Sequence, residues 1–142
     1  MPRPLLLVTL SGPPTLIPTA WRSGQLPAGV TYESDLDKAL EGVDAVIALR
    51  LQRERQESGL LPSLREYSRV WGLTSNRVAR MRPGAPVMHP GPMNEGVEID
   101  AAVAHGNRSL IEKQVTNGVA VRMALLYLLV GAGAAAPVEE RV

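Results

Sequence analysis

Apolar residues along this chain gather in short continuous runs, separated by stretches rich in proline, glycine and charged residues. The runs occupy residues 5–10, 30–32, 43–49 and 85–89. A continuous run of this length is typical of a strand that is buried on both faces, where alternation with polar residues is not needed. The pattern therefore predicts four strands, and the run at 43–49 is the clearest of them.

The segments between these runs carry the start and stop signals of helices. A hydroxyl or carboxylate side chain at a helix start can accept the free backbone N–H groups of the first turn, and glycine favours the helix end. The signals predict a short helix at 19–25, one from Ser34 or Asp35 to Leu40 that ends at Gly42, one opened by a capping box at 63–66 and reaching about Trp71, one from Thr74 or Ser75 to Met81, and a long final helix opened by a capping box at 109–112.

The alternation of strands and helices indicates the fold class. We expect an α/β domain of three layers, with a mostly parallel sheet of four to five strands, right-handed crossovers and helices on both faces. The chain of 142 residues is long enough for one such domain. We assign residues 1–131 to this domain and expect residues 132–142 to form a disordered tail. Ligands of such sheets bind beyond the carboxyl ends of the strands.

Composition excludes several classes of function. The net charge of +1 gives no electrostatic reason to expect nucleic acid or an acidic membrane surface as a partner. The chain has no cysteine, which excludes disulfides, thiolate metal sites and thiol nucleophiles. A signal peptide is the alternative interpretation of the first apolar run. Gly12-Pro13-Pro14 stands where a cleavage site would be, so a buried strand is favoured.

The end of the chain contains a second strongly apolar run, at 119–130. This run is shorter than the ~20 residues that span a bilayer, and Arg122 interrupts it. We therefore expect a soluble, cytoplasmic protein that does not enter a membrane. From Val115 to Val130 apolar residues occupy nearly every side of the predicted helix. A helix on one sheet needs a single apolar stripe, so a second surface is expected to cover this one.

One candidate site is the polar segment that follows the run at 43–49. Arg50 stands directly after that strand, so its guanidinium is held at the edge where ligands bind. A guanidinium suits the bidentate capture of a carboxylate or a phosphate. Gln52 lies two residues further on, where an extended backbone presents its side chain on the same side. A charged loop that only reaches the surface is the alternative interpretation.

A second candidate site is Met88-His89-Pro90-Gly91-Pro92-Met93-Asn94, at the end of the fourth run. Two prolines that flank a glycine restrict the backbone and remove two amide donors. The carbonyls of Pro90, Gly91 and Pro92 can then serve as fixed acceptors for a ligand amine. The Gly91-Pro92 bond is a candidate for the cis form. A rigid connector in which His89 is a hydrogen-bonded core histidine explains these residues equally well.

Other sequence signatures of chemistry are missing. The chain has no glycine-rich phosphate loop, no Gly-x-Ser-x-Gly nucleophile elbow and no metal-ligand cluster, because His89 and His105 have no suitably spaced partners. Residue types and spacing alone therefore predict an α/β domain with an anion-binding crevice and no metal site.

Several segments, in the right order, resemble the aspartate carbamoyltransferases. Residues 88–94 resemble the signature of the second, aspartate-binding domain of these enzymes, and residues 49–55 resemble its aspartate-binding strand end. The similarity spans about residues 5–131 and implies a Rossmann-like carbamoyltransferase domain. The remaining similar segments are the turn after the first strand at 12–18, the loop and helix at 64–74, and the closing helix at 114–123.

The resemblance also implies a reaction. L-aspartate and carbamoyl phosphate would give N-carbamoyl-L-aspartate and phosphate, the committed step of pyrimidine synthesis, without a metal, a cofactor or a covalent intermediate. Arg50 would grip an aspartate carboxylate, supported by Gln52. The Gly91 and Pro92 carbonyls would receive the carbamoyl amino group and the attacking amine, and His89 and Pro90 would be substrate-binding residues beside them. Catalysis by positioning and charge stabilisation suits such a site.

The chain also departs from the family pattern. The Ser-Thr-Arg-Thr phosphate-binding motif, the histidine that polarises the carbamoyl carbonyl and the arginine for aspartate's other carboxylate belong to the family's first domain, and this chain lacks them. We therefore expect the aspartate-binding half alone, inactive without the carbamoyl phosphate-binding domain, and a homo-oligomer, a trimer, when complete. Glu95 stands where relatives usually carry arginine, which brings an acidic side chain toward a site for anions.

Two alternatives remain at this point. Ornithine carbamoyltransferase, the sister enzyme, uses a His-Cys-Leu-Pro segment, whereas this chain has Pro90-Gly91 in place of Cys-Leu. Arg50 suits a second carboxylate rather than an ammonium group, so aspartate is favoured. The other alternative is a non-catalytic homologue that binds or regulates a complete carbamoyltransferase.

Overall fold

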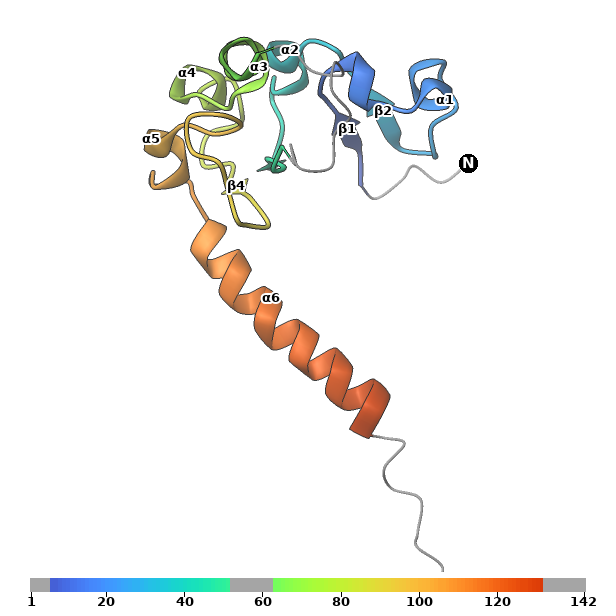
Figure 1. The fold of residues 1–142 in the computed structure, drawn as a ribbon, viewed down its shortest axis with the longest axis vertical. Coiled ribbons are helices and arrows are strands. Elements are labelled where there is room, and N and C mark those ends of the chain that lie inside the picture. The colour runs from blue at the N-terminus through green and yellow to red at the C-terminus, as the bar shows by residue number, and fades with distance from the viewer. Residues whose placement is uncertain (1–5, 52–62, 132–142) are drawn as a thin grey trace, which may run out of the picture.

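The computed structural model describes residues 6–51 and 63–131 (Figure 1). Strands and helices alternate along the chain, which confirms the predicted α/β class. The elements are β1 (Val8–Leu10), η1 (Pro14–Leu16), α1 (Thr19–Arg22), β2 (Val30–Tyr32), α2 (Leu36–Ala39), β3 (Val46–Ile47), α3 (Leu64–Trp71), α4 (Ser75–Val78), β4 (Val87–Met88), α5 (Ala101–Ala104), α6 (Ile111–Leu126) and the π-helical turn η3 (Tyr127–Gly131).

The described strands are parallel, as predicted, but they form two separate pairs. β1 pairs with β2 in the register Val8 to Val30, and β3 pairs with β4 in the register Val46 to Val87. Within the described residues no ladder joins the pairs, so the expected single sheet is found as two two-stranded sheets. β4 is only two residues long. Pro86 and Pro90 stand on either side of it, and neither has an N–H group to donate to a ladder.

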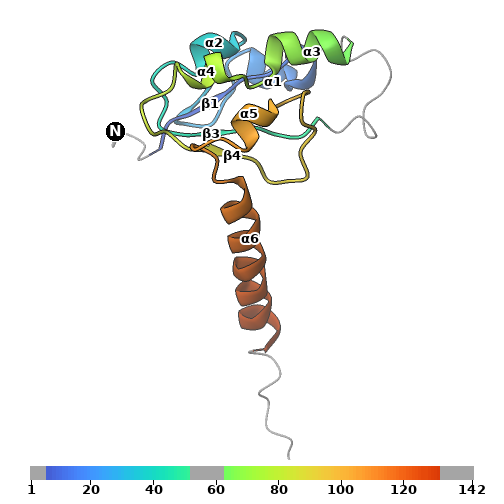
Figure 2. The same ribbon diagram turned by 90° about the vertical axis from the view of Figure 1, so that its left-hand side faces the viewer.

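Most of the helices lie on one side of the strands. Figure 2 shows α2, α3, α4 and α5 on that side, whereas α6 leads away from the other. The sequence predicted helices on both faces of the sheet. In the described part of the chain they lie mostly on one. Side chains alternate along β3: Val46 and Ala48 pack against the core, and Ile47 and Leu49 are 55% and 67% exposed. Ile47 and Leu49 thus mark a second, exposed face of this segment in the described part of the chain.

Local capping signals explain where most helices begin. Asp35, Ser63 and Thr74 each accept a hydrogen bond from a backbone N–H of the first turn that follows. Ser109 accepts from the N–H of Ile111, although α6 begins two residues after Ser109. The short helix α5, which has no side-chain cap, was not predicted from the sequence. The expected tail at 132–142 lies outside the described residues.

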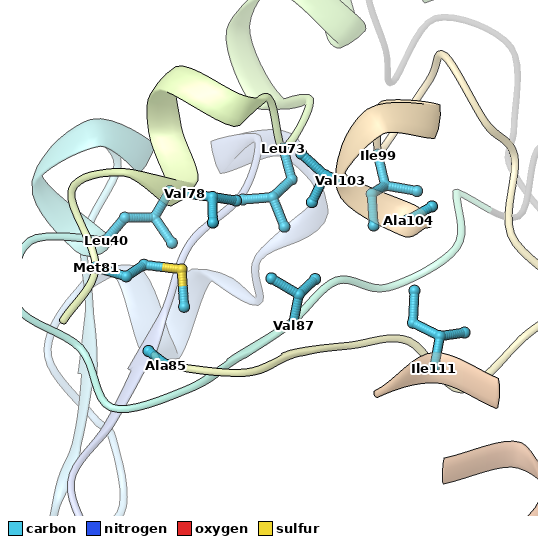
Figure 3. Packing of buried hydrophobic residues seen from close by; sticks show 10 residues of the cluster. All are labelled: Leu40, Leu73, Val78, Met81, Ala85, Val87, Ile99, Val103, Ala104 and Ile111. Atoms are coloured by element: carbon cyan, nitrogen blue, oxygen red, sulfur yellow. The ribbon is translucent and has the colours of Figure 1, made fainter. Parts of the chain in front are cut away.

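The core lies between β3–β4 and the helices α4 and α5 (Figure 3). Val87 of β4 and Ile99, just before α5, are completely buried. Ile111 at the start of α6 closes one side of this core. The cluster consists of Leu40, Leu73, Val78, Met81, Ala85, Val87, Ile99, Val103, Ala104 and Ile111.

Beyond its first turns, α6 leads away from the other described elements of the domain (Figure 1). The large apolar side chains of α6 and η3 from Val115 to Val130 are 42% to 78% exposed. Together, α6 and η3 form a 21-residue helical segment, Ile111–Gly131, with a mean hydropathy of 1.3. By length and composition alone this segment could cross a membrane. The expectation that the chain does not enter a membrane counted only the run at 119–130 and not the whole predicted helix, so it stays a prediction. Arg122 near the middle of the helix still argues against a membrane span.

Candidate functional site

The two segments predicted to carry chemistry lie at the same edge of the β3–β4 sheet. The strands are parallel, and the Ala48 N–H donates to the Met88 carbonyl at 2.9 Å, so both chains leave the sheet in the same direction. The side-chain amide of Asn94 then donates to the Leu51 carbonyl at 3.4 Å. Arg50, which is partly buried, thus lies on a segment that is tied to the proline-rich turn. Gln52 lies outside the described residues.

The turn formed by residues 89–92 presents its backbone to solvent. Its Gly91-Pro92 bond is cis, as predicted. Gly91 has φ +65°, a conformation that residues with a Cβ atom rarely adopt. Pro90 and Pro92 are exposed. Within the described residues the carbonyls of Pro90, Gly91 and Pro92 accept no hydrogen bond. They can therefore accept N–H groups from a ligand.

His89 supports this turn from behind. Its Nδ1 accepts from the Gly91 N–H at 2.9 Å, so the proton of the neutral imidazole is on Nε2. Nε2 lies 3.3 Å from Glu98 Oε1 without the geometry of a hydrogen bond, and the two groups form an ion pair only when His89 is protonated. The side chain of His89 is completely buried. His89 therefore supports the turn through its Nδ1 atom. Direct contact between His89 and a ligand stays a prediction.

Glu98 joins the two ends of the turn. This carboxylate is 3% exposed and accepts from the backbone N–H of Asn94 at 2.5 Å and from its side-chain amide at 3.3 Å. Burial first, and then the negative charge of Glu98, raise the pKa of Tyr67 on α3 above its ordinary value. Sequence reasoning gave Glu98 no function. The available signal was a lone carboxylate between Val97 and Ile99, because a buried charge needs partners.

Gln114 holds the turn from α6. Its Oε1 accepts from the His89 backbone N–H at 3.0 Å. The sequence placed Gln114 at the start of the closing-helix segment but assigned it no function. The bond joins residues 25 positions apart, so no local pattern could have indicated it.

Glu95 does not stand as a lone acid beside the site. Its Oε1 lies 2.9 Å from Nε2 of His105, at the end of α5, and both side chains are exposed. The expected unfavourable effect on anions is therefore reduced whenever His105 is protonated.

Other parts of the described structure are less suited to be the site. No group of three or more potential metal ligands was found among the described residues. An open hollow of about 460 Å³ is lined by Gly84, Pro86, Asn107, Arg108 and Leu110. It lies at the amino end of β4, opposite the edge where parallel strands present ligand-binding loops. The turn at 89–92, together with Arg50, remains the candidate site.

Comparison with known proteins decides the family. The model of the family described as "Aspartate/ornithine carbamoyltransferase, Asp/Orn binding domain" matches residues 19–129. The chain belongs to this family.

Curated relatives place this Asp/Orn-binding domain beside the aspartate enzymes. It is 54% identical over 132 residues to the aspartate carbamoyltransferase catalytic subunit of Desulfitobacterium hafniense, covering 93% of this chain and 41% of the relative. It is 59% identical over 126 residues to that of Chloroflexus aurantiacus, covering 87% of this chain and 40% of the relative. The chain thus spans about two fifths of the length of these relatives.

Solved structures confirm the carbamoyltransferase fold. Ornithine carbamoyltransferase from Thermus thermophilus superposes with a TM-score of 0.69 at 22% identity, covering 87% of this chain and 39% of that one. Aspartate transcarbamoylase from Trypanosoma cruzi, in complex with phosphate, gives 0.65 at 23% identity, covering 86% and 40%. At such identities the likeness concerns the fold alone.

Proposed function

We propose that this chain is the aspartate-binding domain of an aspartate carbamoyltransferase, which forms N-carbamoyl-L-aspartate and phosphate from L-aspartate and carbamoyl phosphate. The observation that carries the proposal is the 54–59% identity to aspartate carbamoyltransferase catalytic subunits. The site supports the proposal as well. The proline-rich turn offers carbonyl acceptors, and Arg50 offers the cation that a carboxylate substrate requires.

The proposed chemistry is a carbamoyl transfer between two bound substrates. The aspartate amine attacks the carbamoyl carbon, a C–N bond forms, the C–O bond to phosphate breaks, and the amine loses a proton. In this proposal Arg50, with Gln52, holds an aspartate carboxylate by bidentate hydrogen bonding. The carbonyls of Pro90, Gly91 and Pro92 orient the amine and the carbamoyl amino group. The contribution of these residues is positioning, which alone can account for a large part of such a rate acceleration.

Aspartate is the proposed substrate rather than ornithine. The family includes enzymes for both. The curated relatives at 54–59% identity are aspartate carbamoyltransferases. A guanidinium at position 50 pairs with the second carboxylate of aspartate and would repel the ammonium group of ornithine. The same relatives are catalytic subunits, which disfavours the alternative of a non-catalytic regulatory homologue.

The proposed partner of this domain is a carbamoyl phosphate-binding domain. The chain spans about two fifths of its relatives, and α6 exposes apolar side chains along most of its length. A continuous exposed apolar surface of this kind marks an interaction site, whereas an ordinary monomer surface carries apolar residues singly. We propose that the carbamoyl phosphate-binding domain covers α6 and that the complete protein is a homo-oligomer, a trimer.

The test measures formation of carbamoyl-aspartate by the purified chain, alone and with the carbamoyl phosphate-binding domain of the Desulfitobacterium hafniense relative. We expect no turnover by the chain alone and turnover by the mixture. Arg50→Ala should weaken aspartate binding roughly hundredfold, since a charge-assisted bidentate pair contributes about 3 kcal/mol. Arg50→Lys should restore little, because a single ammonium cannot replace the planar fork.

Arg82→Ala is the matched control, because Arg82 lies near the opposite end of β3 and pairs there with Asp44. It should leave aspartate binding unchanged. Turnover by the chain alone, or unchanged aspartate affinity in Arg50→Ala, would place the site or the missing groups elsewhere.

A further inference from the structure

The candidate site is linked to α6 by two consecutive side chains. Gln114 Oε1 accepts from the His89 backbone N–H at 3.0 Å. A Cβ atom added at Gly91 would lie 3.5 Å from Val115 Cγ2, so Val115 packs closely over the turn. From Val119 onward the large apolar side chains of α6 are 47% or more exposed. The helix therefore contacts the site at one end and stands free at the other.

The hydrogen bond from His89 is well placed to set the orientation of the turn. His89 directly precedes Pro90, Gly91 and Pro92, whose carbonyls are the proposed ligand acceptors. Glu98 fixes the far end of the same turn through Asn94. Since Pro90 and Pro92 have no N–H groups, few other backbone bonds can hold these residues. The Gln114 side chain thus holds the near end of the turn through this one hydrogen bond.

We propose that Gln114 is a positioning residue, through which packing of a partner on α6 orients the carbonyls of the site turn. This inference rests on the function proposed above. An α-helix is stiff over a few turns, and Gln114 lies five residues, about 7.5 Å along the axis, from Val119, where the exposed surface begins. A partner that covers the exposed surface restrains the helix, and the Gln114 bond carries that restraint to His89. The site is then in its working geometry only when α6 is covered.

The first test follows the His89 amide by NMR-detected hydrogen exchange in the 142-residue chain. Gln114→Met keeps the length of the side chain but removes the acceptor, whereas Gln114→Glu keeps an oxygen at the same place. We expect Gln114→Met to speed exchange of the His89 amide about fivefold to tenfold, as loss of one hydrogen bond implies. Gln114→Glu should restore most of the protection. Lys113→Met, an exposed neighbour with no partner in the described structure, should have no effect.

The second test adds the carbamoyl phosphate-binding domain. Binding of this domain should slow hydrogen exchange of the His89 amide in the unsubstituted chain. In Gln114→Met it should slow that exchange much less. In the active mixture, Gln114→Met should lower kcat/KM for L-aspartate about tenfold without changing the KM for carbamoyl phosphate. Gln114→Glu should recover most of this loss. If Gln114 had only a structural role, Gln114→Met would lower thermal stability. It would not act on L-aspartate kinetics alone, and Gln114→Glu would not restore them.

The outcomes separate the two proposals. Turnover by the unsubstituted mixture together with unaffected turnover in Gln114→Met would overturn the positioning role and leave the proposed function standing. Equal slowing of His89 exchange in the chain and in Gln114→Met would also overturn it. No turnover by the unsubstituted mixture would overturn the proposed function, and the positioning role with it.

Discussion

Residues 73–104 and residues 115–130 are both rich in apolar side chains, yet these side chains differ in how far they are buried. In the first segment the core residues from Leu73 to Ala104 are no more than 8% exposed, and Val87 and Ile99 are completely buried. In the second the large apolar side chains are 42% to 78% exposed. Composition therefore does not decide burial. The first segment crosses back on itself through β4 and α5, whereas α6 runs outward, and beyond its first turns none of the described elements packs along its apolar side chains.

The sharpest test of this contrast is a pair of truncations, one in each region. Ile99→Ala should lower the free energy of unfolding by about 2–5 kcal/mol, because it opens a cavity in a packed core. Leu129→Ala should change it by no more than about 0.5 kcal/mol, since the side chain is 78% exposed. Urea denaturation followed by circular dichroism measures both. A large loss in Leu129→Ala would mean that α6 packs against the domain in solution.

The apolar surface of α6 should also control association. We expect the purified chain to self-associate, with the mass measured by light scattering rising with concentration. Replacing Leu125 and Leu129 together by lysine should yield a monomer with an unchanged circular dichroism spectrum, because the charges stay in water only if α6 is uncovered. The matched control places both lysines at Thr116 and Asn117, on the polar part of the helix. A strictly monomeric chain whose α6 amides are fully protected from exchange would contradict the contrast.

A smaller effect is expected inside the buried region. Glu98→Gln should lower the pKa of Tyr67 by removing a negative charge, while the pKa stays above its ordinary value because burial is the larger cause. The folded state binds the Tyr67 proton more tightly than the unfolded state. The stability linked to it is therefore complete below about pH 10 and is lost as the pH rises through the folded pKa. Ultraviolet titration of tyrosinate measures the shift.

Tyr32 is the internal control for that titration. Its pKa is raised mainly by burial, and Glu98 is not among the causes. The Tyr32 step should keep its place in Glu98→Gln. An unmoved Tyr67 step would show that Glu98 does not act on α3.

Much of the site could be predicted because it depends on local sequence and on one rule of parallel sheets. Arg50 follows β3 and the turn at 89–92 follows β4, so a parallel pairing brings both to one edge. The cis Gly91-Pro92 bond was likewise readable from two prolines around a glycine. Most helix starts followed from a capping side chain such as Asp35 or Thr74.

The rest could not be predicted because it depends on distant contacts. Gln114 bonds to His89 across 25 positions, and nothing in either neighbourhood marks the pair. The division of the strands into two pairs depends on backbone distances that apolar runs do not encode.

The uncovered length of α6 has a consequence for the life of this chain in a cell. Proteases and chaperones continuously remove or retain incompletely folded chains, and a stability difference of about 1–2 kcal/mol changes the steady-state amount of a protein several-fold. A chain with α6 uncovered is a target for proteases and chaperones, whereas a chain with α6 covered is not. We therefore expect the amount of this protein in a cell to follow the supply of whatever covers that helix, even where its own synthesis is constant.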